Sequence, residues 1–173
     1  RSGDAYSYSW FESVKGTGTT ITLKLPLTLA IIDGLLVEIG NTSFVMPLSV
    51  IEECIELPSD IINKAHGRHM ASLRGELVPY ISLREFFGIT STQPDISQIA
   101  IAEVDGTRIG FVVDRVIGQH QTVIKTLGRV YRDVEGVSGA TILGDGTIAL
   151  MLDVNQLSQM AHEMEEIMVN RHH

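Results

Sequence analysis

Short apolar or alternating segments, separated by turns that contain Gly, Asn or Asp, run along most of the chain. Residues 35–39 lead into a Gly40-Asn41 turn, and residues 99–104 lead into an Asp105-Gly106 turn. Two-residue turns of this composition between apolar segments are typical of β-hairpins. Further strands are expected over residues 44–46, 50–57, 77–81, 108–117, 121–125, 140–143 and 147–152.

Helical spacing of apolar residues is sustained only near the C-terminus. Over residues 157–169 the apolar positions recur three and four apart, which predicts the one long helix. Residues 83–87 are expected to form a short helix that ends at Gly88, and residues 61–65 a brief helical turn. The pattern as a whole therefore predicts an all-β fold with little helix.

The N-terminal stretch has the pattern of a separate hairpin. Residues 6–11 alternate aromatic with polar side chains, residues 19–25 alternate again, and Gly16 and Gly18 lie between them. An isolated hairpin is only marginally stable in water. We therefore expect this pair of strands to be the edge of a larger domain that precedes the rest of the chain.

The two halves of the remaining chain repeat each other in pattern. Residues 38–44 match residues 103–109 at a constant offset, and residues 75–83 match residues 146–154. This favours a duplication, although two short β segments could also share hairpin turns by chance. Each half has about 60 residues, fewer than the roughly 100 of an immunoglobulin-like sandwich. Two small barrels that share a groove fit better.

Composition narrows the class of protein. The chain has 173 residues, 44% of them hydrophobic and 20% charged, which excludes a disordered chain. The formal net charge of −8 argues against nucleic-acid binding, which needs a basic surface. The apolar residues 25–37 are interrupted by Pro26, Asp33 and Gly34, so no membrane insertion is expected. One cysteine, Cys54, allows no internal disulfide and favours a reducing compartment, where it is expected as a small buried hydrophobe.

Candidate chemistry is sparse. His66 and His69 lie three residues apart, but the only nearby carboxylate is Asp60, so a solvated loop is preferred to a metal site. The Gly-x-Ser-x-Gly motif is absent, and the glycine-rich residues 16–20 lack the Lys-Ser/Thr ending of a Walker A loop. We therefore expect no catalytic, cofactor-binding or metal-ligating residues. The terminal His172-His173 pair is typical of a purification tag and is given no function.

Two sets of residues remain as candidate sites. Glu53 lies in an otherwise apolar strand, which predicts a half-buried ion pair, and Arg74 is the favoured partner. Apolar residues near turns are candidates for a protein interface, with core packing as the alternative. These candidates are Val78, Tyr80, Ile89, Ile124, Val130 and Tyr131.

Several of these segments resemble the chemotaxis histidine kinases of the CheA type. Residues 20–31 (TITLKLPLTLAI) are similar to the junction at which the last strand of the kinase's ATP-binding domain enters its regulatory domain. The LPLTLA run resembles the kinase more than its adaptor relative CheW, whereas the later similar segments are shared by both. Those segments are residues 31–37, 44–48, 50–57, 73–81 and 142–154, and the resemblance covers residues 19–160.

The resemblance implies two five-stranded SH3-like barrels side by side and a short C-terminal helix. Residues 1–30 are then expected to be a remnant of the upstream ATP-binding domain with its linker, although residues 1–18 fit the family less well. The first barrel is expected from residues 31–92 with 140–160, by strand exchange at its end. The second is expected from residues 93–155, with the helix and tail over residues 156–173.

The resemblance also implies a function. The domain would dock a CheW-type adaptor and the cytoplasmic tips of chemoreceptors, in the cytoplasm at receptor arrays, and would contact the kinase's own ATP-binding domain. No cofactor is expected here; ATP and Mg²⁺ would belong to the parent, a histidine autokinase. Two alternatives stay open: a stand-alone adaptor of the CheW class, and a small β-barrel enzyme or ligand-binding domain.

Overall fold

The computed structural model describes residues 9–14, 16, 18–23, 31–58, 70–123 and 134–170, and describes side chains within residues 31–58, 70–123 and 134–163. The chain divides into two compact units, residues 1–30 and 31–173. The first unit contains strands β1 (Ser9–Val14) and β2 (Gly18–Leu23), which pair antiparallel from Ser9 opposite Leu23 to Val14 opposite Gly18. The predicted N-terminal hairpin is confirmed. Its origin in an ATP-binding domain stays a prediction.

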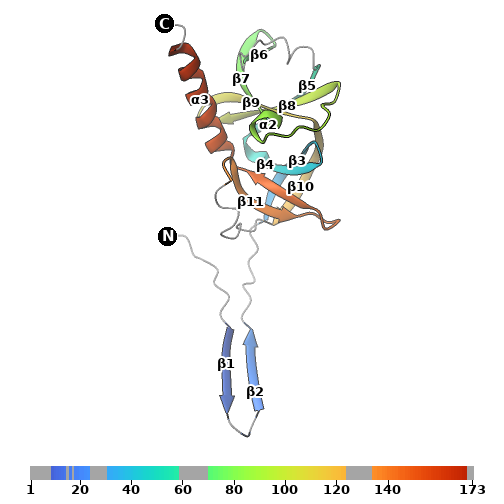
Figure 1. The fold of residues 1–173 in the computed structure, drawn as a ribbon, viewed down its shortest axis with the longest axis vertical. Helices are drawn as coiled ribbons and strands as arrows, with labels where there is room; N and C mark the ends of the chain where they lie inside the picture. Colours follow the sequence, from blue (N-terminus) through green and yellow to red (C-terminus); the bar gives the residue numbers. More distant parts are fainter. Residues whose placement is uncertain are drawn as a thin grey trace. The chain divides into compact units, whose positions relative to one another are not determined.

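The described residues of the second unit form two five-stranded sheets and three helical segments (Figure 1). The helical segments are the 3-10 turn η1 (Leu48–Val50), α2 (Leu83–Phe86) and α3 (Val154–Asn170). The strands are β3 (Ile31–Ile39), β4 (Thr42–Pro47), β5 (Ile51–Pro58), β6 (Met70–Leu73), β7 (Glu76–Ser82), β8 (Ile96–Val104), β9 (Thr107–Val113), β10 (Arg115–Val123), β11 (Val137–Ile142) and β12 (Ile148–Leu152).

The two sheets have the same topology, which confirms the duplication. One has the order β10-β3-β4-β12-β11 and is called here the β3 barrel; the other has the order β5-β8-β9-β7-β6 and is called the β8 barrel. Each contains one parallel pair, β4 with β12 and β7 with β9. Even the irregularities correspond, since β10 is bulged against β3 between Val116 and Gly118, and β5 against β8 between Ile51 and Glu53.

The strands are exchanged between the repeats more extensively than predicted. The first repeat gives β3 and β4 to one barrel but β5, β6 and β7 to the other, and the second repeat does the reverse. The expected first barrel, residues 31–92 with 140–160, correctly joins β3 and β4 to β12 and part of β11, but it includes β5, β6 and β7 and omits β10. The expected second barrel, residues 93–155, differs from the β8 barrel in the same way. An alternating pattern marks which face of a strand is buried but does not identify its neighbour.

The exchange depends on a break within a segment that is predicted as one strand. A single strand is expected over residues 108–117, but the structure has two, β9 and β10, which separate at Asp114 and enter different sheets. The apolar run Phe111–Val113 belongs to the β8 barrel, and Val116 belongs to the β3 barrel. The charged residues Asp114 and Arg115 therefore mark a crossover between the barrels, which the prediction of a single strand missed.

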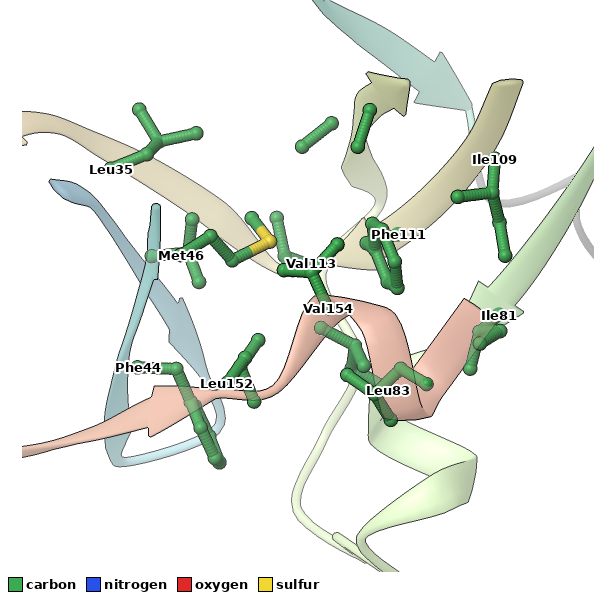
Figure 2. Close-up of a cluster of buried hydrophobic side chains, with 14 of the residues drawn as sticks. Leu35, Phe44, Met46, Ile81, Leu83, Ile109, Phe111, Val113, Leu152 and Val154 are labelled. Carbon is green, nitrogen blue, oxygen red and sulfur yellow. The ribbon is translucent and has the colours of Figure 1, made fainter. Parts of the chain in front are cut away.

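A hydrophobic core is shared by the two barrels (Figure 2). Leu35, Phe44 and Met46 come from the β3 barrel, and Ile109 and Phe111 come from the β8 barrel. Figure 2 shows these side chains converging with others from α2 and the start of α3. Since burial of apolar side chains is the main favourable term in folding, this shared cluster joins the barrels into one cooperative body.

The helices α2 and α3 each follow directly after a strand and are capped by polar side chains. The Ser82 hydroxyl accepts a hydrogen bond from the Glu85 N–H at 3.4 Å at the start of α2. A carboxylate oxygen of Asp153 accepts one from the Gln156 N–H at 3.0 Å at the start of α3. In α3 the side chains of Leu157 and Ala161 are buried in the shared core. Over the described parts of the chain, no helix is long and apolar enough to cross a membrane.

Candidate docking surfaces

An ionic network covers one end of the β8 barrel. The Arg108 guanidinium on β9 donates to Glu52 at 2.7 Å, to Glu76 at 2.6 Å and to Glu53 at 3.2 Å. Arg74 Nη2 lies 2.7 Å from the other oxygen of Glu53, so the ion pair expected from the sequence is present. The hydrogen bonds to Glu52 and Glu76 raise the pKa of Arg108 above its usual value. The network connects β5 to the turn between β6 and β7. In it, three carboxylates surround two guanidinium groups.

The orientation of β5 explains why the predicted half-burial of Glu53 is correct and the predicted burial of Cys54 is wrong. Ile51, Glu53, Ile55 and Leu57 face the barrel to varying degrees, while Cys54 lies on the opposite face and is exposed. Adjacent residues of a strand point to opposite faces, so Glu53 and Cys54 could not both point inward. The expectation of a buried Cys54 is therefore wrong. Partial burial and then the Glu53 charge raise the pKa of the Cys54 thiol.

The interface candidates fall into three groups. Val78 and Tyr80 are buried inside the β8 barrel, which is the core-packing alternative; burial and then Glu85 raise the pKa of Tyr80. Ile89 is half-buried and packs against the shared core. Ile124, Val130 and Tyr131 lie outside the described residues, as do His66 and His69. An interface role for Ile89 stays a prediction.

Exposed apolar side chains mark equivalent positions of the two barrels. Leu77 on β7 is 66% exposed and Ile148 on β12 is 63% exposed, and the alignment of residues 75–83 with 146–154 matches these two residues. Ile142, directly opposite Ile148 on β11, is also exposed. Sequence reasoning selected Val78, the inward neighbour of Leu77, because proximity to a turn does not reveal which face a side chain occupies.

A polar groove of about 770 Å³ lies where the two barrels meet. Glu38 and Asn41 line it from the β3 barrel, Glu56 and Ile96 from the β8 barrel, and the loop from Ser91 to Pro94 forms part of its wall. Arg115 bonds Glu38 across β10 and β3 at 2.5 Å within the groove. Its surface offers carboxylates, amides and one exposed isoleucine.

A second ion pair, which sequence reasoning did not detect, reaches this groove through Asp114. Arg84 on α2 pairs with Asp114 at the crossover between the barrels, and the two side chains are only 11% and 14% exposed. The two residues are thirty positions apart in the sequence. Arg84 lies in a short helix, and Asp114 lies where a single strand was expected. Neither the spacing nor the hydrophobic pattern links such residues.

The surface features described above can be compared with the parts of known kinds of site. Among the residues that the structure describes, no three His, Cys, Asp or Glu side chains gather as a metal ion would require. The exposed apolar residues, the ionic network and the open groove resemble the parts of a protein interface, which combines apolar anchors with a polar rim. The class defined by the fold is a β protein of two five-stranded barrels that share a core.

Comparison with known proteins identifies the family. Residues 33–162 match the model of the CheW-like domain, and the chain belongs to that family. Its relatives include the chemotaxis protein CheA of Salmonella typhimurium, 39% identical over 88% of this chain, and CheA of Bacillus subtilis, 40% identical over 84%. The sensor histidine kinase CheAY of Helicobacter pylori is 37% identical over 89% of the chain. The chain spans only 23%, 22% and 19% of these relatives.

A solved structure supports the same fold. The scaffolding protein TtCheW from Thermoanaerobacter tengcongensis superimposes with a TM-score of 0.60 and 21% sequence identity, covering 71% of this chain and 89% of that protein. The expected fold of two CheW-like barrels is therefore confirmed. The similarity to CheA proteins is stronger in sequence than the similarity to this CheW.

Proposed function

We propose that this chain is the regulatory, CheW-like domain of a chemotaxis histidine kinase. It docks a CheW-type adaptor and the cytoplasmic tips of chemoreceptors, and thereby couples receptor state to kinase activity. The observation that carries this proposal is the 39–40% identity, over 84–88% of the chain, to proteins named CheA.

The parent protein would be a histidine autokinase that binds ATP and Mg²⁺ in a different domain. The CheW-like domain would contact that ATP-binding domain in the same chain. It would work in the cytoplasm at receptor arrays, without inserting into the membrane itself. One relative named above, CheAY, is a sensor histidine kinase of which this chain spans 19%, which supports a kinase as the parent protein.

The duplicated architecture supports a docking mode. Leu77 and Ile148 offer similar apolar contacts at equivalent positions of the two barrels, so one module can engage two neighbours. A partner with the same two-barrel fold can do likewise. Head-to-tail contacts of this kind close into rings when the rotation between neighbours allows it.

Calorimetric titration of this chain with a purified CheW-type adaptor tests the proposal. Saturable binding is expected, and Leu77→Ala or Ile148→Ala should each weaken it by about tenfold, as loss of an apolar anchor does. Ile117→Ala is the matched control, since Ile117 is also exposed but lies on β10 away from either position. Absence of saturable binding by the unsubstituted chain would refute the docking function.

Arg74 provides a second test of the same surface. Its side chain is 79% exposed, so Arg74→Ala should change the melting temperature little while removing one of the two guanidinium groups that contact Glu53 on β5. We expect adaptor or receptor binding to weaken more than stability does. Unchanged binding in a pulldown would remove Arg74 and Glu53 from the docking surface.

The stand-alone adaptor remains a second candidate, because the fold covers 89% of a CheW chain. An adaptor would bind the CheW-like domain of a separate kinase and would not need CheW. Parallel pulldowns with a CheW protein and with an isolated kinase CheW-like domain distinguish the two: preference for CheW supports the kinase domain, and preference for the kinase supports the adaptor.

A further inference from the structure

The half-buried pair of Arg84 and Asp114 binds three separate segments of the chain at the junction of the barrels. Arg84 Nε donates to Asp114 Oδ1 at 3.1 Å, and its Nη2 donates to the other carboxylate oxygen. Its Nη1 donates to the backbone carbonyls of Ile89 at 3.2 Å and Ser91 at 2.5 Å. One guanidinium therefore holds both the crossover and the loop that leads from α2 to β8.

The carboxylate of Asp114 adds the third segment. Its Oδ2 accepts a hydrogen bond from the Gly40 N–H at 2.7 Å, at the turn between β3 and β4. Gly40 has a φ of +60°, and a Cβ atom there would lie 2.6 Å from Ser91 Oγ and 2.9 Å from Ile89 Cγ2. The loop thus packs directly on the turn, and the ion pair lies where the two meet.

This arrangement is present at only one of two equivalent crossovers. The counterpart of Asp114 between β4 and β5 is the short turn η1, whose residues Leu48–Val50 carry no charge. Arg84 is the second residue of α2, and the second residue of α3 is Asn155. The duplication therefore supplies a comparison within the molecule, in which one junction is fixed by charge and the other by apolar contacts with the shared core.

We propose that Arg84 and Asp114 form a latch that positions residues 89–92 against the Gly40 turn and so sets the wall of the groove. Arg84 suits this role because a planar guanidinium can bond a carboxylate with two nitrogens and still donate to carbonyl groups. A lysine ammonium at the same place would keep the charge but lose this geometry. The latch acts on docking through the loop and touches no partner itself; that part of the inference rests on the proposed function.

Hydrogen exchange of the whole chain tests the latch directly. In Arg84→Gln, the backbone amide of Gly40 and those of residues 89–92 should exchange faster by about tenfold or more, while amides of β8 and β9 stay unchanged. Arg84→Lys should fail to restore slow exchange. Arg115→Gln is the control, because Arg115 lies in the same groove but pairs only with Glu38 and is 66% exposed.

A single substitution leaves one charge unpaired and half-buried, which can unfold the domain. The double variant Arg84→Gln/Asp114→Asn removes both charges together and keeps the test interpretable. If the backbone amides of residues 40 and 89–92 exchange as slowly in the folded double variant as in the unsubstituted chain, the latch is overturned. Fast exchange at these residues alone supports it.

Adaptor titration of the same variants tests the effect on docking. We expect the folded double variant to bind the adaptor more weakly by about tenfold, and Arg115→Gln to bind normally. Faster loop exchange with unchanged affinity would overturn the docking role of the latch. If even the unsubstituted chain binds no adaptor, the proposed function fails, while the exchange experiment still decides whether the latch exists.

Discussion

Leu83→Ala is the sharpest test of the shared core. The Leu83 side chain is 0% exposed and packs among residues of both barrels (Figure 2). Truncation of a fully buried leucine costs the transfer free energy of the lost atoms and leaves a cavity, in total about 2–5 kcal/mol. Alanine favours a helix, so the short helix α2 adds no penalty of its own. For a chain of this size the loss lowers the melting temperature by about 2–4 °C per kcal/mol.

The assay is urea and thermal unfolding followed by circular dichroism, with Leu77→Ala as the matched control. The same side chain is truncated six residues away at a position that is 66% exposed, so its free energy of unfolding should change by less than about 1 kcal/mol. Leu83→Ala should also unfold in a single transition, since the core that it disturbs belongs to both barrels. If the two variants lose similar stability, or if Leu83→Ala unfolds in two steps, the shared core does not join the barrels energetically.

Three further predictions concern single residues. Gly110→Ala should cost about 1–3 kcal/mol in urea unfolding because its Cβ would lie 2.3 Å from Ile99 Cδ1, whereas Gly144→Ala, with nothing within 4 Å, should be nearly neutral. Cys54 should react with Ellman's reagent more slowly than glutathione near pH 8, since its raised pKa reduces the thiolate fraction, and Glu53→Gln should accelerate the reaction; an unchanged rate would contradict the role of that charge. Asp153→Ala should lose about 1 kcal/mol and speed amide exchange at the start of α3, while Asp153→Asn, which can still cap, should not.

Local features of the fold could be predicted from the sequence because they depend on local chemistry. The Gly40-Asn41 and Asp105-Gly106 turns were predictable since both require positive φ, which Gly40, Asp105 and Gly106 adopt. The duplication was visible because equivalent turns recur at a constant offset. The pairing of Glu53 with Arg74 followed from a carboxylate within an apolar strand.

Features that depend on the partners of a strand could not be predicted in this way. Phe111–Val113 and Val116 were assigned to one strand across the charged residues Asp114 and Arg115, yet they lie in different barrels, since only tertiary packing decides where a strand pairs. The exposed face of β5 was assigned wrongly at Cys54 because glutamates occur on both of its faces. Arg84 and Asp114 were missed because their bond joins segments that the sequence pattern leaves unrelated.

The reciprocal exchange of strands has a consequence for the order in which the chain can fold during synthesis. The hairpin of β3 and β4 leaves the ribosome early, but its neighbours β10 and β12 are made near the end, and Ser43 pairs with Ala149. The β8 barrel needs nothing beyond β9 and can assemble first. The hairpin of β3 and β4 must therefore wait with both edges open until the last strands arrive, a period in which long-range pairing is slow and chaperone binding would matter most.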